Sequence, residues 1–168
     1  FDVPMEQYET TPGQFEAVPL MIDGVLYVTT PYNNIAALDA ETGKELWRFD
    51  GEGYKLGQLL SASGWKLRGT AFWRDKNKLY IFLNSRNRLF KLDAQTGKPA
   101  PDFGTQGWSS LTAGLPRISD ERHYTQSSPP VIYKDLVIMG SQIPDRVQIA
   151  DPVGQVQAIN ARYGVAIP

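Results

Sequence analysis

The sequence contains no cysteine and a single histidine among its 168 residues. Without cysteine the chain forms no disulfide, offers no thiolate nucleophile and cannot hold zinc through sulfur. With His123 alone, a metal site built from several histidines is excluded, and residues 119–124 (SDERHY) are typical of a surface loop. Any catalytic or metal chemistry must therefore rest on carboxylates, hydroxyls, amides and basic side chains.

The chain also lacks a charge bias and a long apolar run. Its net charge of −1 gives no reason to expect a nucleic-acid partner, which would need a basic stripe. Residues 86–91 (RNRLFK) are rich in Arg and Lys, but acids lie nearby, and we interpret the segment as a solvated face. No segment is long and apolar enough to span a bilayer, and no signal-peptide pattern opens the chain. Because residue 1 is Phe, we expect a processed or trimmed sequence.

What is present is a recurring turn. Residues 35–44 (IAALDAETGK), 88–98 (RLFKLDAQTGK) and 156–164 (VQAINARYG) each contain an apolar strand, an Asp or Asn, and a closing Gly. The Asp side chain can accept from backbone N–H groups of the turn, and Gly can adopt the positive φ that closes it. The turn glycines are 54 and 67 residues apart, which is the size of a propeller blade.

Strand pairs precede each of these turns. Residues 17–29 flank an Asp-Gly hairpin signal, residues 70–83 flank a charged turn at 74–78, and residues 131–139 flank Lys134 and Asp135. The sequence therefore predicts an all-β fold, a β-propeller fragment of about three four-stranded antiparallel blades. The single partial domain 1–168 contains repeat units at 13–50, 67–104 and 127–168.

Long connections separate the predicted units. Residues 50–66 and 98–126 have no counterpart in the repeat, and residues 141–155 form another excursion within the last unit. Propellers close with four to eight blades, and three would leave apolar faces and strand edges uncovered. We therefore expect the remaining blades to come from the rest of a longer chain or from a second polypeptide.

Four motifs in this order resemble the N-terminal part of the quinoprotein dehydrogenases, which use pyrroloquinoline quinone (PQQ). They are residues 13–20 (GQFEAVPL), 67–73 (LRGTAFW), 93–104 (DAQTGKPAPDFG), and 127–130 (SSPP) with 139–141 (MGS). The nearest branch is the glucose and alcohol dehydrogenases. The resemblance implies an eight-bladed periplasmic propeller that oxidises a sugar or alcohol hydroxyl by hydride transfer to the quinone. Bound Ca²⁺ would polarise the quinone, and a membrane quinone or a cytochrome would accept the electrons.

The same resemblance assigns site residues by their place in the motifs. Glu16 matches a glutamate that hydrogen-bonds the cofactor, and Arg68 matches an arginine that pairs with a PQQ carboxylate. Plainer alternatives are a strand-end carboxylate, a surface arginine and a turn that favours small hydroxyls. Three further residues match positions that donate to or line the cofactor: Ser127, Ser141 and Gln142.

The metal assignment stays open between two acids of one loop. Asp145 matches the carboxylate that binds Ca²⁺, and Asp151 would take this role if the loop has another register. The family's catalytic residues belong to later blades, so none is assigned here, and the chain alone is expected to be inactive.

The chain departs from the family at two places. Ala62 and Ser63 stand where many alcohol-oxidising members have a vicinal disulfide, and Trp65 is either a substitute stacking surface or blade packing. The third turn has Asn160 and Tyr163 for Asp and Thr, which indicates drift or an altered turn. The remaining tryptophans are interpreted as packing between blades: Trp47, Trp73 and Trp108.

A competing hypothesis is a non-enzymatic propeller that acts as a scaffold or protein-interaction module. Such a protein shares the repeats but has no use for an arginine and two acids near the propeller axis. The joint presence of Glu16, Arg68 and Asp145 therefore favours the dehydrogenase.

Overall fold

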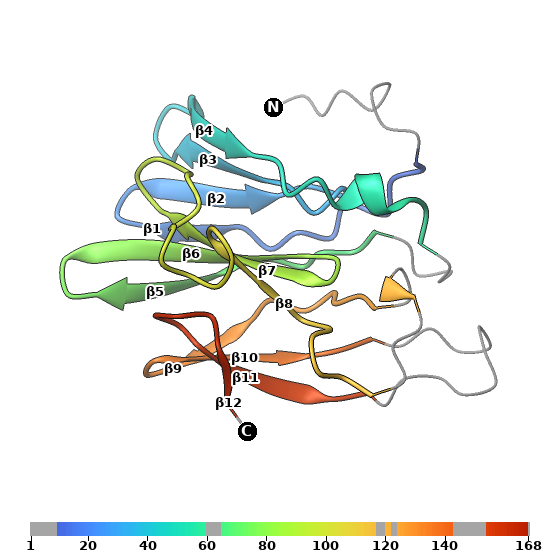
Figure 1. Cartoon of the computed structure of the whole chain (residues 1–168). Coiled ribbons are helices and arrows are strands. Elements are labelled where there is room, and N and C mark those ends of the chain that lie inside the picture. The colour runs from blue at the N-terminus through green and yellow to red at the C-terminus, as the bar shows by residue number, and fades with distance from the viewer. Residues whose placement is uncertain (1–9, 60–64, 117–119, 122–123, 143–153, 168) are drawn as a thin grey trace.

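The computed structural model describes residues 10–59, 65–116, 120–121, 124–142 and 154–167, which form three four-stranded antiparallel sheets (Figure 1). The first sheet contains β1 (Leu20–Ile22), β2 (Val25–Thr29), β3 (Ile35–Asp39) and β4 (Glu45–Phe49). The second contains β5 (Ala71–Asp75), β6 (Lys78–Ser85), β7 (Arg88–Asp93) and β8 (Trp108–Ser110). The third contains β9 (Val131–Tyr133), β10 (Leu136–Gly140), β11 (Val156–Asn160) and β12 (Ala166–Ile167). In each sheet the strands lie in chain order, so the predicted blade architecture is confirmed.

The first hairpin has the geometry that its sequence predicts. Asp23 and Gly24 both take positive φ, 51° and 79°, so the turn twists in the sense of the strands it joins. Leu20 pairs with Tyr27 and Ile22 with Val25 across it. The corresponding turns of the other sheets also contain a residue in the left-handed region, Lys76 and Lys134.

The Gly-terminated turns repeat closely in all three sheets. Asp39 Oδ1 accepts from the N–H and the hydroxyl of Thr42 at 2.7 and 2.6 Å, and Asp93 is bonded in the same way by Thr96. In the third turn Asn160 Oδ1 accepts from two backbone N–H groups instead. The closing glycines have φ of 72°, 70° and 72°. The third turn therefore keeps its backbone geometry despite its different side chains.

The fourth strand of the second sheet, β8, lies at Trp108–Ser110, beyond the approximate unit 67–104 and inside a connection that has no counterpart in the sequence repeat. A tight turn precedes it, in which Gly104 and Gly107 take positive φ and Gly107 packs against Pro99. Because β8 has only three residues and follows this turn, its strand signal is too short to read. The other long connection contains a 3₁₀-helix, η2 (Gly53–Leu56).

Both faces of the second sheet are buried, because successive side chains of β6 alternate between two apolar clusters. Ile81 and Leu83 pack in an apolar cluster with the first sheet, while Tyr80 and Phe82 pack in a second cluster with the third sheet. Successive side chains of a strand point to opposite faces, so one strand serves both interfaces. The three sheets are thus stacked face to face with the second sheet between its neighbours (Figure 1).

The basic segment at 86–91 is not a solvated face, and that interpretation is wrong. Arg86 and Asn87 are buried, and Arg86 donates to the Gly57 carbonyl at 2.8 Å while it stacks on Trp65. Arg88 donates to the Gly51 carbonyl at 2.9 Å. The connection at 50–59 therefore covers the β6–β7 turn and supplies acceptors for its donors, which permits burial of the charges.

Lys91, on β7, is also buried, with 2% of its surface exposed. Its Nζ lies 4.2 Å from the ring centre of Tyr80 and donates to the Arg162 carbonyl at 3.3 Å. Burial lowers the pKa of Lys91, while the neighbouring acids oppose that shift. The lysine therefore belongs to the interface between the second and third sheets.

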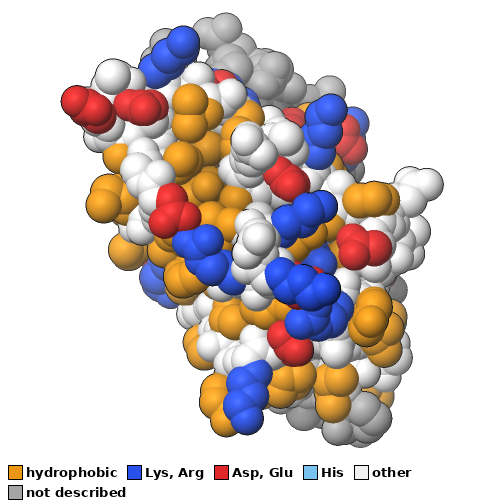
Figure 2. Space-filling view, turned by 90° about the vertical axis from the view of Figure 1, so that its left-hand side faces the viewer, with side chains coloured by type: hydrophobic (Ala, Val, Ile, Leu, Met, Phe, Trp, Pro, Cys, Tyr) orange, Lys and Arg blue, Asp and Glu red, His pale blue; other side chains and the backbone are white. Residues whose placement is uncertain are grey.

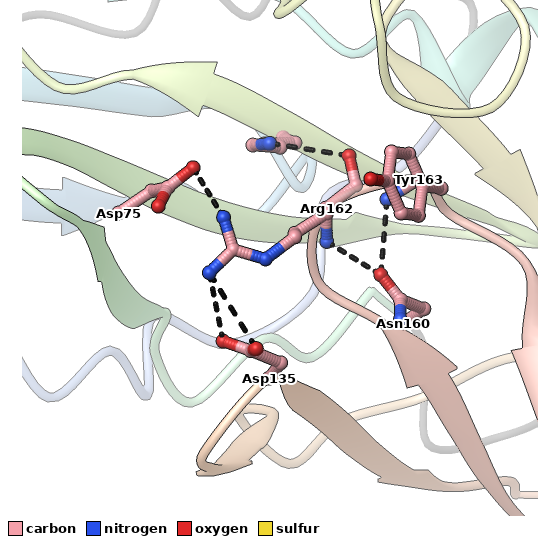
Figure 3. A network of polar contacts seen from close by, with 6 residues as sticks. Asp75, Asp135, Asn160, Arg162 and Tyr163 are labelled. Carbon is pink, nitrogen blue, oxygen red and sulfur yellow. Dashed lines mark hydrogen bonds and ion pairs between the residues drawn. The ribbon is translucent and has the colours of Figure 1, made fainter.

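An ion-pair network reinforces that interface (Figure 3). Arg162 Nη1 lies 2.5 Å from Asp75 of the second sheet, and Nη2 lies 3.5 Å from Asp135 of the third. The guanidinium also covers Trp73 at 5.0 Å.

Figure 2 shows the face that carries the hairpin turns, where basic side chains gather beside acidic ones. No helix among the described residues is long and apolar enough to cross a membrane.

Candidate functional site

Three predicted site residues occupy equivalent positions in the three sheets. We call the segment that runs into the first strand of each sheet its lead-in segment: residues 14–19, 65–70 and 125–130. Glu16 precedes β1, Arg68 precedes β5 and Ser127 precedes β9, each by three or four residues. The stretches before the first strands of the three sheets thus bring these side chains into one cluster.

Backbone hydrogen bonds join the three lead-in segments. The N–H of Val18 donates to the Arg68 carbonyl, and the N–H of Arg68 donates to the Ser127 carbonyl, both at 2.9 Å. Gly69 makes this close approach possible, because its φ is 152° and an added Cβ would lie 3.1 Å from the Val18 carbonyl oxygen. The close approach of the first and second lead-in segments therefore explains the glycine at position 69.

The side chains meet on this backbone frame. Arg68 Nε lies 3.2 Å from Glu16 Oε2, and Arg68 Nη1 donates to Ser127 Oγ at 3.2 Å. A fourth residue, Lys66, places its Nζ 3.0 Å from Glu16 Oε1. We call Glu16, Lys66, Arg68 and Ser127 the lead-in cluster. The hydrogen bond that Glu16 accepts from Lys66, together with the charges of Lys66 and Arg68, holds the pKa of Glu16 below its usual value.

Exposure differs within the lead-in cluster. The Arg68 side chain is 48% exposed, whereas Lys66 and Glu16 are exposed by 24% and 27%. Arg68 therefore keeps an edge towards solvent while Lys66 approaches Glu16 from the inner side. The cluster carries one net positive charge and one hydroxyl, a set of groups that suits an anionic ligand.

The two residues after β10 have different surroundings. Ser141 Oγ donates to the Gln155 carbonyl at 3.3 Å and accepts from the Gln155 N–H at 3.0 Å. Gln142 pairs through its backbone with Thr125 of the third lead-in segment. It also lines a polar cavity of about 10 Å³, room for about one water molecule, among turns and connections of the three sheets. The cavity is lined by Asn33, Leu59, Lys66, Arg86, Thr125, Gln126 and Gln142.

The structure thus brings Glu16, Arg68 and Ser127 into contact and places Gln142 beside the same cluster through the cavity that Lys66 shares. Ser141 instead joins β10 to the segment before β11. Their roles in binding a cofactor stay predictions.

Several predicted residues lie outside the described part of the chain: Asp145, Asp151, Ala62, Ser63 and His123. Within the described residues, no group of three acids or histidines is arranged to hold a metal ion. The Ca²⁺ assignment therefore stays a prediction.

Trp65 is completely buried, with Tyr32 at 6.0 Å and the Arg86 guanidinium at 4.7 Å from its ring. It therefore serves packing and offers no stacking surface to a ligand.

Lys66 was missed at the sequence level, although a signal exists. Lys66 and Arg68 are two residues apart, the spacing that puts side chains on one face of an extended chain. Once Arg68 is placed at the site, the same face is expected to carry Lys66.

A family model described as "PQQ: Glucose/ethanol/alcohol dehydrogenase, beta-propeller domain" matches residues 2–167. The chain belongs to this family. Its members use PQQ. The quinohemoprotein alcohol dehydrogenase ADH IIB of Pseudomonas putida is 35% identical over 127 residues, covering 75% of this chain and 16% of that protein. The dehydrogenase subunit of the alcohol dehydrogenase (quinone) of Gluconobacter oxydans is 36% identical over 140 residues, covering 79% and 16%.

Solved structures give the same picture. The quinohemoprotein alcohol dehydrogenase from Comamonas testosteroni aligns with a TM-score of 0.66 at 25% identity, over 92% of this chain and 20% of that one. A europium-containing methanol dehydrogenase aligns with a TM-score of 0.60 at 18% identity, over 95% and 24%, and shares the fold. The chain thus spans about a sixth of the length of these curated relatives and matches part of a quinoprotein dehydrogenase propeller.

Proposed function

We propose that these three sheets form one wall of the PQQ site of a periplasmic dehydrogenase that oxidises sugar or alcohol hydroxyls. The lead-in cluster carries this proposal, because equivalent positions of three successive sheets place Glu16, Arg68 and Ser127 in contact. The family membership supports the choice of cofactor. The remaining blades and the electron acceptor, a quinone or a cytochrome, are expected as partners.

The residues present fit a quinone that bears carboxylates. The half-exposed Arg68 guanidinium can pair with one carboxylate through its solvent-facing edge, and the Ser127 hydroxyl lies 3.2 Å from the same guanidinium. Glu16 is held ionised beside them, where a carboxylate can accept a hydrogen bond from the ligand. A second cation, Lys66, keeps the whole cluster positive, so an anionic ligand meets a favourable field.

When bound, PQQ with Ca²⁺ supplies the electron sink for hydride transfer from the substrate. This chain's residues bind and orient that group: Arg68 by charge, Ser127 and Gln142 by polar contacts. Asp145, or Asp151 in its place, is proposed as the Ca²⁺ carboxylate. The general base that takes the hydroxyl proton is expected on a later blade.

The decisive experiment compares two arginines near opposite ends of one strand: Arg68, which precedes β5, and Arg74, which lies within β5. Arg68 and Arg74 are 48% and 47% exposed, and each pairs with an acid, but Arg74 bonds Asp23 at the hairpin end of β5. The full polypeptide that carries these sheets is titrated with PQQ and CaCl₂ by equilibrium dialysis. Arg68→Ala is expected to raise the Kd about 10- to 100-fold, since a charge-assisted pair is lost. Arg74→Ala is expected to leave it unchanged.

Equal affinity of Arg68→Ala and the wild type would overturn the role of Arg68. A wild-type polypeptide that binds no PQQ at all would overturn the dehydrogenase proposal and favour the scaffold. No structural observation among the described residues favours the scaffold over the enzyme.

A further inference from the structure

Glu16 is contacted by two cations on its two carboxylate oxygens. Lys66 Nζ lies 3.0 Å from Oε1, and Arg68 Nε lies 3.2 Å from Oε2. The two cations differ in surroundings, because Lys66 is half as exposed as Arg68 and lines the inner polar cavity. Each oxygen of Glu16 thus has its own partner, one inner and one outer.

The backbone of Lys66 is firmly placed. Trp65 before it is fully buried, and Leu67 after it is buried in the cluster between the first two sheets. An added Cβ on Gly13 would lie 2.0 Å from the Trp65 carbonyl oxygen, so the chain just before the first lead-in segment packs directly on this stretch. Lys66 therefore reaches Glu16 from a rigid base, which is what orienting a neighbouring carboxylate requires.

Arg68 has two competing uses. Its guanidinium can pair with Glu16 through two parallel hydrogen bonds, the preferred geometry of arginine with a carboxylate. In the structure Nε lies 3.2 Å from Glu16 Oε2, while Nη1 donates to Ser127 and part of the group faces solvent. Lys66 contacts the other oxygen of Glu16, Oε1, and so competes with a bidentate pair between Arg68 and Glu16.

We propose that Lys66 is a positioning residue: by holding Glu16 Oε1 it keeps Arg68 available to bind an anionic ligand. This inference rests on the proposed function only for the identity of the ligand, PQQ. It assigns Lys66 no contact with the cofactor itself. The charged groups around Glu16 and Lys66 are Arg68 and, across the cavity, Arg86.

A double-mutant cycle with PQQ binding as readout tests the proposal. Lys66→Met keeps most of the length of the side chain and removes its charge, and we expect the Kd for PQQ to rise about 3- to 10-fold in the otherwise native protein. In the background of Glu16→Gln the same change is expected to have a smaller effect, because no carboxylate remains to capture Arg68 and only the field of the Lys66 charge is lost. The matched control is Lys55→Met in η2, which breaks a surface pair with Glu52, the residue before η2, and is expected to leave the Kd unchanged.

Each other outcome overturns the positioning role. A loss of undiminished size in the Glu16→Gln background would mean that Lys66 acts on the ligand directly and not through Glu16. An unchanged Kd for Lys66→Met, beside a weakened Arg68→Ala, would remove Lys66 from the site while the proposed function stands. Lys66→Arg retains the charge and is expected to keep the Kd within about threefold of the wild type; failure of this rescue would indicate a merely structural effect.

A second measurement is independent of PQQ. The side-chain carboxyl of Glu16 is titrated by NMR in the wild type and in Lys66→Met, each first checked for a native circular dichroism spectrum. Removal of Lys66 is expected to move the titration of Glu16 to higher pH. An unchanged titration would overturn the proposal even if PQQ binding itself is absent, so the two failures are distinguishable.

Discussion

The two interfaces between sheets are built from the same repeat but are held by different chemistry. Between the first and second sheets, Trp47 donates its indole N–H to the Ala94 carbonyl at 3.0 Å and packs over Gly97. Between the second and third sheets, Arg162 joins Asp75 and Asp135 across the boundary (Figure 3). The first interface thus combines this tryptophan with one exposed ion pair, Arg74 with Asp23, whereas in the second interface one arginine joins two acids.

Part of the difference arises at one turn position. Gln95 and Arg162 are equivalent, each the third residue of its turn, and Arg162 pairs with Asp75 of the preceding sheet. The turn backbone is nearly identical in all three copies. A repeat can therefore exchange the chemistry of an interface without altering the turn that presents it.

The largest effect is expected at the aromatic interface. Trp47→Ala removes the indole hydrogen bond and leaves a void over Gly97, so we expect the free energy of unfolding to fall by about 2–4 kcal/mol. Urea denaturation followed by circular dichroism measures this change. Leu46→Ala, on the exposed side of the same strand, is the control and should change little. Equal losses for both variants would show that Trp47 does not join the sheets.

A smaller effect of opposite sign is expected at Lys91. Lys91→Met removes a buried charge and keeps the apolar stem against Tyr80, so the free energy of unfolding should rise by about 1 kcal/mol near neutral pH.

The pH dependence of this gain has a defined direction. The pKa of Lys91 is lowered by burial, so the folded state releases its proton before the unfolded state does. Wild-type stability therefore recovers as the pH rises from the folded pKa towards 10.5, and the advantage of Lys91→Met should shrink over this range. A gain that stays constant up to pH 10.5 would contradict this assignment.

The ion pair between Asp75 and Arg162 is expected to contribute less than either residue above, because both side chains remain partly exposed. A double-mutant cycle with Asp75→Asn and Arg162→Met measures the coupling, which should fall in 1 M salt. The hydrogen bond from Arg162 and its charge lower the pKa of Asp75, so the coupling is present above pH 3.8 and is lost as the pH falls through the folded pKa. A coupling that is insensitive to both salt and acid would exclude an ionic origin.

The smallest effect is expected at Tyr163. Tyr163→Thr restores the residue that the other two turns use, but the Asn160 side chain already accepts two backbone hydrogen bonds there. We expect a change within about 0.5 kcal/mol in the free energy of unfolding. A loss above 1 kcal/mol in the free energy of unfolding would show that contacts of the exposed tyrosine ring stabilise the fold.

The sequence allowed prediction of local features that rest on local physics. Asp39, Asp93 and the three turn glycines specify their turns through hydrogen bonds within five residues, so the repeat and the blade architecture could be read directly. The boundary of β8 could not, because a three-residue strand is fixed by its pairing with β7 rather than by its own pattern.

The site shows the same division. Arg68 could be placed from its motif, but Lys66 was missed because its partner, Glu16, is fifty residues away in the chain. The burial of Arg86 could not be predicted from the sequence either, because the carbonyl that accepts its hydrogen bond belongs to Gly57, in a connection without any repeat pattern. Charged residues are assigned to solvent by default, and only the tertiary structure reveals the acceptors that permit burial.

The lead-in cluster has a consequence for how such a site can change over time. Each sheet presents one or two residues to the shared cluster from a short stretch before its first strand, while the strands that follow hold the sheet together. Substitution at one lead-in position alters the chemistry offered to a ligand and leaves the packing of that sheet intact. The ligand preference of a site assembled in this way can therefore change through single substitutions before the first strands, while the repeated sheets keep their fold.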